Sequence, residues 1–186
     1  MKRSIIIAVS LAAALALAGC SSGEEQTDPV NIGGQTTITV PGDGGEASVS
    51  SDSYKFTYSG TTVQVNTDVS AALAAFGDDY TYYESNSCAY QGLDKIYTYP
   101  LFVIYTYPDG DRDMISSVEV KADVISTEEG IRIGSSRDDV TAAYGDDYQD
   151  AGSVIKYTKG ESVLSFVFEN DEVSGIVYDY ANLRTE

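Results

Sequence analysis

The sequence has no histidine and no tryptophan, and only two of its 186 residues are cysteine. Histidine is the side chain that most often acts as a general base or a metal ligand near neutral pH. The chain also has no Gly-x-Ser-x-Gly elbow, and Gly42-Asp43-Gly44-Gly45 is not followed by the lysine and helix of a phosphate-binding loop. These absences argue against an enzyme, so we expect no catalytic residues, no cofactor and no metal site.

An uncharged run near the N-terminus is too short to span a membrane. Ile5 to Leu17 follows two basic residues and is shorter than the roughly 20 apolar residues of a membrane-spanning helix. Leu17-Ala18-Gly19-Cys20 then matches the bacterial lipobox at every position. The pattern predicts a lipoprotein signal peptide over residues 1–19 and lipidation of Cys20. The alternative is an ordinary signal peptide with a cysteine at its end by chance.

Cysteine is too scarce for a disulfide framework. With Cys20 assigned to the lipid, Cys88 is the single remaining cysteine, and no internal disulfide can form. We expect Cys88 to be a small buried residue, with pairing to another molecule as the alternative. The fold must then be held together by its core.

Basic residues are also scarce. Without residues 1–19, the chain carries 29 acidic and 9 basic side chains, a formal charge of −20. Such a surface repels nucleic acid and anionic lipid headgroups. We therefore expect an extracytoplasmic protein as the partner, with a glycan as the alternative and membrane contact through the lipid anchor. The acidic, tyrosine-rich composition favours the outer face of a Gram-positive cell membrane.

Composition divides the rest of the chain into a stalk and a domain. Residues 21–53 contain no aromatic and no basic side chain, so they cannot bury enough apolar area to order themselves. We predict that residues 20–53 form the lipidated cysteine and a flexible acidic stalk. All fifteen tyrosines and all five phenylalanines follow, between Tyr54 and Tyr180. The predicted domain therefore covers residues 54–186.

Two segments of this domain resemble each other. Val65–Tyr80 aligns without gaps on Ile133–Tyr148, with six of sixteen positions identical. Each copy predicts a short helix that ends at a glycine in the left-handed conformation, Gly77 or Gly145. The expected N-terminal caps are Thr67 or Asp68 in the first helix and Ser135 or Ser136 in the second.

Each predicted helix precedes three β-rich runs. These runs are Lys95–Tyr99, Leu101–Tyr107 and Ile115–Val120 after the first helix, and Val154–Thr158, Val163–Phe168 and Val173–Tyr178 after the second. The last two runs of each set flank a turn and predict a hairpin. We expect an α+β domain of two tandem units, about residues 54–125 and 126–186. Each unit would be a helix plus an antiparallel β-meander, and the two would share a sheet.

The first of these turns has some features of a calcium loop. Asp109-Gly110-Asp111-Arg112-Asp113 has alternating oxygen ligands, like the start of an EF-hand loop. However, Met114 stands where the loop needs glycine, and Val120 stands where it needs a bidentate glutamate. Asp-Gly is a preferred turn pair, so we predict a hairpin turn.

The order of these motifs resembles a known family. Ile133-Gly134-Ser135-Ser136, then Asp138-Asp139-Val140 and an aromatic-Gly pair, followed by a meander, resembles the unit of β-lactamase-inhibitor-protein-like (BLIP-like) domains. The small outer-membrane-assembly lipoproteins of the SmpA/OmlA type are similar. The resemblance is best at Ile131–Tyr148 and weaker at Val63–Tyr80. It implies a protein-binding surface on a concave sheet and its hairpin tips. Lone Cys88 cannot form the disulfide of the secreted inhibitors, so inhibition of a β-lactamase is not carried over.

The sequence leaves open which face of the sheet is exposed. Phe166 and Phe168 stand at the aligned positions of Tyr105 and Tyr107, which favours a core location for the two tyrosines. In that case Phe102, Ile104 and Thr106 would face the open side, with Ser117, Glu119 and Lys121. In the alternative, Tyr105 and Tyr107 are exposed interface residues.

The predicted function is non-catalytic binding. The candidate binding surface comprises Tyr97, Tyr99, Phe102, Ile104, Asp109, Asp111 and Glu119. We predict a lipid-anchored extracytoplasmic binding module that binds an envelope or extracellular protein through its sheet face and hairpin tips. The alternatives are a cell-wall or glycan-binding lipoprotein and a structural lipoprotein of envelope assembly.

Overall fold

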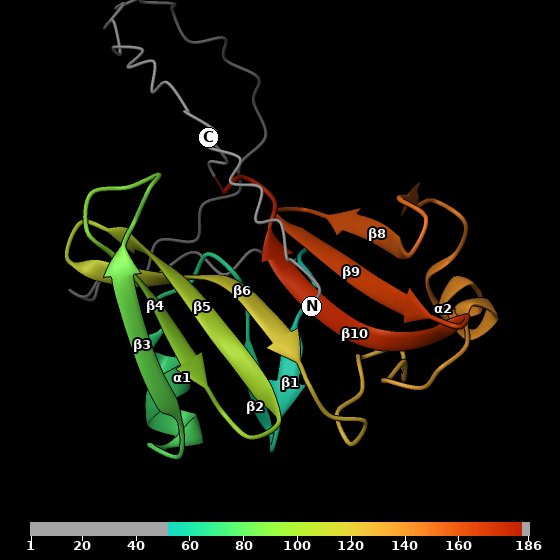
Figure 1. Ribbon diagram of the computed structural model, residues 1–186, viewed down its shortest axis with the longest axis horizontal. Helices are drawn as coiled ribbons and strands as arrows, with labels where there is room; N and C mark the ends of the chain where they lie inside the picture. Colours follow the sequence, from blue (N-terminus) through green and yellow to red (C-terminus); the bar gives the residue numbers. More distant parts are fainter. Residues whose placement is uncertain (1–51, 184–186) are drawn as a thin grey trace, which may run out of the picture. The chain divides into compact units, whose positions relative to one another are not determined.

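The computed structural model describes residues 52–183 (Figure 1). The predicted signal peptide, Cys20 and all but the last two residues of the predicted stalk lie outside this range. The elements are β1 Phe56–Tyr58, β2 Thr61–Val63, α1 Ser70–Phe76, β3 Thr81–Asn86, β4 Leu93–Thr98, β5 Phe102–Asp109, β6 Arg112–Val120, α2 Arg137–Tyr144, β7 Gln149–Asp150, β8 Val154–Lys159, β9 Ser162–Glu169 and β10 Glu172–Tyr180. Neither of the helices in residues 52–183 is long and apolar enough to cross a membrane.

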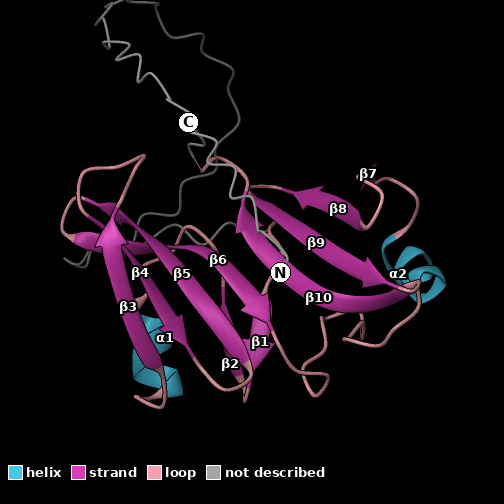
Figure 2. Ribbon diagram, viewed as in Figure 1, coloured by secondary structure: helices cyan, strands magenta, loops and turns pink. Residues whose placement is uncertain are grey.

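Eight of the strands form one antiparallel sheet. Their order is β3-β4-β5-β6-β10-β9-β8-β7, and β1 and β2 form a separate two-stranded sheet. Figure 2 shows the eight strands as one continuous layer, with α1 behind the β3–β5 part of it. The centre of the layer is the β6–β10 pair, in which Val118 lies opposite Tyr178. This pair joins the two parts of the chain through backbone hydrogen bonds.

The prediction of an α+β domain built from two helix-plus-meander units is wrong. The described residues are mostly β, with about 48% in strands or bridges and 11% in helix, and all the main strands belong to one sheet. The reason is the small size of the helices. α1 has seven residues and buries only Ala72, and α2 has eight and buries only Val140. Neither is large enough to form a layer that would make the class α+β.

The two predicted hairpins are present, and their turns explain their registers. Asp109 pairs with Arg112 at the β5–β6 turn, and Glu169 pairs with Glu172 at the β9–β10 turn. Asn170 and Asp171 both have positive φ (54° and 65°), as a type I′ turn requires. Gly110 supplies the positive φ of the other turn. The prediction of a hairpin turn at Asp109-Gly110 is therefore confirmed.

The helix ends agree only partly with the sequence predictions. Ser136 caps α2 in a capping box with Asp139, whereas α1 begins after Val69 without a side-chain cap. The cap position is therefore Val69 and not the predicted Thr67 or Asp68, although the Asp68 side chain accepts a hydrogen bond from the N–H of Ser70, the first residue of α1 (2.8 Å). Gly77 and Gly145 end the helices with positive φ (76° and 84°), as expected. The predicted left-handed helical conformation is nevertheless wrong, because their ψ values near −170° place both glycines in another region that is almost restricted to glycine.

The core lies between the sheet and the helices and is rich in aromatic rings. The Phe102 ring stacks on Tyr99 with centroids 4.7 Å apart and packs against Phe56 and Phe76 at 5.0 Å each. Further along the same side of the sheet, Phe166 packs against Tyr144 at 5.2 Å. Offset and edge-on ring contacts of this kind add to the stabilisation from burial.

Two tyrosine hydroxyls anchor the helix ends to this core. Tyr99 donates a hydrogen bond to the carbonyl oxygen of Gly77 (3.0 Å), and Tyr157 donates one to the carbonyl oxygen of Gly145 (2.8 Å). Burial raises the pKa of each hydroxyl to about 12. Each helix therefore ends at a glycine carbonyl that a buried tyrosine satisfies.

Candidate functional site

The face of the eight-stranded sheet that points away from the helices is called here the open face. Along β10, Ile176 and Tyr178 point into the core. Val177 and Asp179 alternate with them, so they point to the open face, and both are half-buried. No helix or strand among residues 52–183 covers this opposite face (Figure 1). Its uncovered centre is the candidate site.

Strand register brings the side chains of the open face into two neighbouring rows. The first row, across six strands, consists of Thr158, Val163, Asp179, Ser117, Tyr105 and Ile96. The second row consists of Lys156, Ser165, Val177, Glu119 and Val103. Side chains directly opposite each other in antiparallel strands lie within contact range. The open face thus combines aliphatic, aromatic and charged groups on the rigid central strands.

Asp179 is the most perturbed carboxyl group of this face. Burial raises the pKa of Asp179 above its ordinary value, and a hydrogen bond from Ser117 and the positive charge of Lys156 offset part of the rise. Asp179 lines a cleft of about 520 Å³ with Lys156, Thr158 and Val163 among its other walls. A partly desolvated carboxylate in a cleft is suited to accept hydrogen bonds from a cationic group.

Glu119 lies beside a second cleft on the open face. Tyr105 donates a hydrogen bond to the Glu119 carboxylate (3.0 Å). Burial and this carboxylate raise the pKa of the Tyr105 hydroxyl. Tyr105 also lines a cleft of about 360 Å³, together with Tyr90 and Ile96. The two clefts adjoin, because Ser116 and Leu183 line both, so the open face offers one continuous hollow surface.

Four of the predicted site residues are buried in the core. The exposed fraction is 6% for Tyr97, 5% for Tyr99, 1% for Phe102 and 0% for Ile104. The prediction that Phe102 and Ile104 face the open side was therefore wrong, and these four side chains cannot contact a partner in this structure.

A one-residue error in aligning the two copies explains this. Tyr99 and Tyr157 occupy equivalent places, because each donates a hydrogen bond to the carbonyl oxygen of the glycine that ends its helix. Two residues earlier, Tyr97 pairs with Ile104 as Ile155 pairs with Phe166. Ile104, not Tyr105, therefore occupies the place that Phe166 holds in β9, and aligning the two tyrosines with the two phenylalanines reversed the faces of β5.

The remaining predicted residues are spread over different places. Glu119 lies on the open face, while Asp109 and Asp111 are exposed at the β5–β6 turn, where Asp109 forms an ion pair with Arg112. Cys20 lies outside the described residues. Cys88, expected to be buried, is exposed in the loop between β3 and β4.

Sequence reasoning missed the main residues of the site. Asp179, Lys156, Val163 and Val177 were not selected. The signal for Val163 and Asp179 was their alternation with apolar residues in β9 and β10, because alternate side chains of a strand point to opposite faces.

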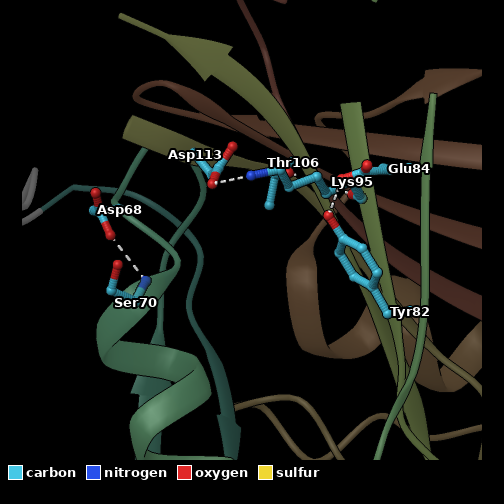
Figure 3. A network of polar contacts seen from close by, with 7 residues as sticks. All are labelled: Asp68, Ser70, Tyr82, Glu84, Lys95, Thr106 and Asp113. Carbon is cyan, nitrogen blue, oxygen red and sulfur yellow. Dashed lines mark hydrogen bonds and ion pairs between the residues drawn. The ribbon is translucent and has the colours of Figure 1, made fainter. Parts of the chain in front are cut away.

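A polar network on the helix side of the sheet has a structural role (Figure 3). Lys95 Nζ forms an ion pair with Asp113 at 2.7 Å, and this hydrogen bond raises the pKa of Lys95. The pair links β4 to the start of β6. Nearby, Asp68 accepts a hydrogen bond from the backbone N–H of Ser70 (2.8 Å). Residues 52–183 hold no group of three or more side chains that could ligate a metal ion.

Comparisons with known proteins leave the family open. No family model matches this chain, and no curated protein sequence matches it. Among solved structures, the uncharacterized protein yfeY from Escherichia coli is similar, with a TM-score of 0.42 and 16% sequence identity. The similarity covers 62% of this chain and 95% of that one. A likeness at this level carries no argument about function, and the resemblance to BLIP-like domains stays a prediction.

Proposed function

We propose that this protein is a lipid-anchored, extracytoplasmic binding module that holds a protein partner on the open face of its sheet. The observation that carries the proposal is the composition of that face. Half-buried Val163, Val177 and Ile96 lie in the same two rows as the carboxyl groups of Glu119 and Asp179. An apolar centre with a few fixed polar groups is typical of protein–protein interfaces.

Charge complementarity defines the partner further. Residues 52–183 carry 23 acidic and 8 basic side chains. Lys156 is the one cation in the two rows of the open face, against two carboxyl groups. We infer a partner with a basic contact surface, whose arginine or lysine reaches Asp179. Such a pair would stabilise the ionised form of Asp179, and long-range attraction would accelerate association.

Attachment to the membrane forms the other part of the proposal. Cys20 would carry the lipid, and residues 21–53 would extend over at most about 110 Å. Acyl chains contribute about 0.8 kcal/mol for each buried CH₂ group, which is enough for stable anchoring when two chains are present. The binding domain would then act at the outer face of a bacterial membrane, and the composition favours a Gram-positive cell. No enzymatic activity is proposed.

A glycan ligand is the second candidate, because Tyr90 and Tyr105 line the same cleft. Sugar rings stack on exposed tyrosine rings. However, the Tyr90 ring already packs on Tyr107, with centroids 4.9 Å apart, and Tyr105 is only half-exposed. These contacts reduce the aromatic area available to a sugar and favour the protein partner.

A capture experiment with matched variants tests the proposal. The mature chain with Cys20→Ser, which carries no lipid, is immobilised and exposed to solubilised envelope protein of the host. Val177→Asp places a charge at the centre of the open face. Val124→Asp makes the same change at a valine that is 74% exposed, between β6 and α2. Thermal unfolding of both variants checks that they are folded.

We expect a retained protein whose affinity falls at least about tenfold, or 1.4 kcal/mol, in Val177→Asp and is unchanged in Val124→Asp. Asp179→Asn should weaken the same complex and reduce its sensitivity to salt. Equal retention by both valine variants would exclude the open face as the binding surface. Retention of purified cell-wall glycan that is lost in Val177→Asp, without any retained protein, would favour the glycan.

A further inference from the structure

The two edges of the eight-stranded sheet are very different. One edge is β7, which has two residues, and the other is β3, which has six. All six side chains of β3 are exposed. Among residues 52–183, no element pairs with the outer side of β3, which lies at the end of the sheet in Figure 1. This edge lies beyond β4, the last strand of the first row of the open face.

The outer side of β3 has unpaired backbone groups, and among the usual protections it has only one charged side chain, Glu84. In an edge strand, about half of the N–H and C=O groups point away from the sheet and can pair with another strand. Natural edges are commonly blocked by lysine, proline or a bulge. Thr81-Tyr82-Tyr83-Glu84-Ser85-Asn86 contains no lysine and no proline. Its register with β4 runs from Thr81–Thr98 to Asn86–Leu93 without a shift.

The exposed aromatic side chains of the described chain are concentrated at this edge. The exposed large hydrophobic residues in residues 52–183 are Tyr82 (45%), Tyr83 (61%) and Val124 (74%). The first two belong to β3. Tyr83 lies opposite Ile96 on the open face, so neighbouring Tyr82 points to the helix side. There the Tyr82 hydroxyl is hydrogen-bonded to the carboxylate of Glu84 (Figure 3). An added strand would therefore have one tyrosine beside it on each face of the sheet.

Negative charge surrounds the same edge on both faces. Glu84 lies on the helix side with Tyr82, and Asp94 lies opposite Ser85 on the open side. Lys95 lies directly opposite Glu84 in β4, but its ammonium group forms an ion pair with Asp113 at 2.7 Å. An incoming strand with basic side chains would be attracted on both faces. A second copy of this chain would be repelled, because it has the same large negative charge.

We propose that the outer edge of β3 is a second docking site, which takes an extended basic segment of a partner protein as a ninth strand. Backbone hydrogen bonds to β3 would provide affinity, as in other cases of strand addition. Tyr82 and Tyr83 would contact alternate side chains of the segment. Glu84 and Asp94 would pair with its lysines or arginines. This site does not depend on the open face.

Amide hydrogen exchange measured by NMR tests the proposal directly. The probe is a short capped peptide of alternating lysine and valine, added to the mature chain with Cys20→Ser. The control peptide has the same side chains and charge, but every backbone nitrogen is methylated and cannot donate. We expect exchange of amides in β3 to slow at least tenfold at saturation with the first peptide and to be unchanged with the second. Equal effects of the two peptides, or slowing outside β3 alone, would overturn strand addition.

A charge-matched pair of variants locates the site independently. Tyr83→Lys removes one aromatic contact and places a lysine on the edge, while Val124→Lys adds the same charge elsewhere on the surface. We expect peptide affinity to fall at least tenfold in Tyr83→Lys and less than twofold in Val124→Lys. Equal losses would mean that net charge alone governs binding. A concentration-dependent dimer with protected β3 amides in the absence of peptide would assign the edge to a second copy and overturn the proposal.

Discussion

The two helices occupy corresponding places in the fold, but only one has its own capping residues. α1 precedes β3 and α2 precedes β7. α2 starts with the Ser136–Asp139 capping box and has two aspartates in its first turn, where negative charge is favourable. α1 has no side-chain cap and no acidic residue in its first turn.

Despite this difference, the same three backbone hydrogen bonds fix the start of each helix. Before α1 these are Asn66 N to Ile115 O (2.7 Å), Ile115 N to Thr67 O (2.8 Å) and Val69 N to Asp113 O (2.9 Å). Before α2 these are Gly134 N to Val173 O (2.8 Å), Val173 N to Ser135 O (2.8 Å) and Arg137 N to Asp171 O (3.1 Å). The sheet therefore positions both helices, and the local cap is an addition that only α2 has.

The largest expected effects test whether the two parts of the sheet unfold together. Phe102→Ala and Phe166→Ala each remove a fully buried ring, so each should lower the free energy of unfolding by about 3–5 kcal/mol. Because the β6–β10 pair joins the two parts, we expect one shared transition in both variants. Denaturant unfolding followed by circular dichroism measures this. Two separate transitions, each shifted by only one of the variants, would show that the parts are independent.

The next effects should be equal at the two helix ends. Gly77→Ala and Gly145→Ala introduce a Cβ at positive φ, and no heavy atom lies within 4 Å of either new Cβ. The cost is therefore backbone strain alone, about 1–3 kcal/mol in each case. Thermal unfolding of the two variants provides the comparison. If one substitution lowered the stability by less than about half as much as the other, the backbone at that helix end would be able to relieve the strain.

The N-terminal caps should distinguish the two helices. Ser136→Ala removes the capping box and should destabilise the protein by about 1 kcal/mol. Asp68→Ala removes one exposed hydrogen bond to the N–H of Ser70 and no capping box, so the expected loss is smaller, at most about 0.5 kcal/mol. Denaturant midpoints of the two variants are sufficient. Equal losses would show that Asp68 caps α1 in practice.

The smallest expected effect concerns Asp179 and depends on pH. Its pKa is raised in the folded state, because burial disfavours the ionised carboxyl group. Above that pKa, ionised Asp179 therefore reduces stability, and the reduction disappears as the pH falls below the ordinary value of 3.8. Asp179→Asn should raise the midpoint of thermal unfolding at pH 7 by a few degrees and have no effect near pH 3. A lower midpoint at pH 7 would contradict this.

Glu119→Gln is the matched change on β6. Glu119 accepts a hydrogen bond from Tyr105 (3.0 Å), which is stronger when the acceptor is charged. The amide oxygen of glutamine can still accept this bond, so the expected loss at pH 7 is less than about 1 kcal/mol. Asp179→Asn should therefore raise the stability at pH 7, and Glu119→Gln should lower it. A stabilisation by both substitutions would show that general charge repulsion dominates.

The parts of the fold that the sequence predicts correctly are those with local signals. β-rich runs on both sides of Asp109-Gly110 and of Asn170-Asp171 indicate both hairpins, and Ser136 followed by Asp139 indicates the start of α2. β3 has no such signal, because both of its faces are exposed and its side chains do not alternate in polarity. The two helices, with seven and eight residues, were also too short for the sequence to establish the fold class.

The candidate site was harder to predict because it depends on strand pairing. Large side chains stand on both faces of β5, so its residue pattern does not mark which face lies in the core, and only the pairing with β4 and β6 decides it. Glu119 was placed correctly because it lies between buried Val118 and Val120 in a regular stretch. Asp179 becomes distinctive only when β10 lies beside β6 and brings it next to Ser117.

The tyrosines that hold the helix ends also make the protein its own optical reporter. With fifteen tyrosines and no tryptophan, near-ultraviolet absorption and fluorescence come from phenol rings without indole interference. Burial raises the pKa of Tyr99 and Tyr157 to about 12, so the unfolded chain loses these protons before the folded one as the pH rises above 10. Stability is therefore lost in strong alkali, and the sharp phenolate absorbance that accompanies it reports the opening of the aromatic core.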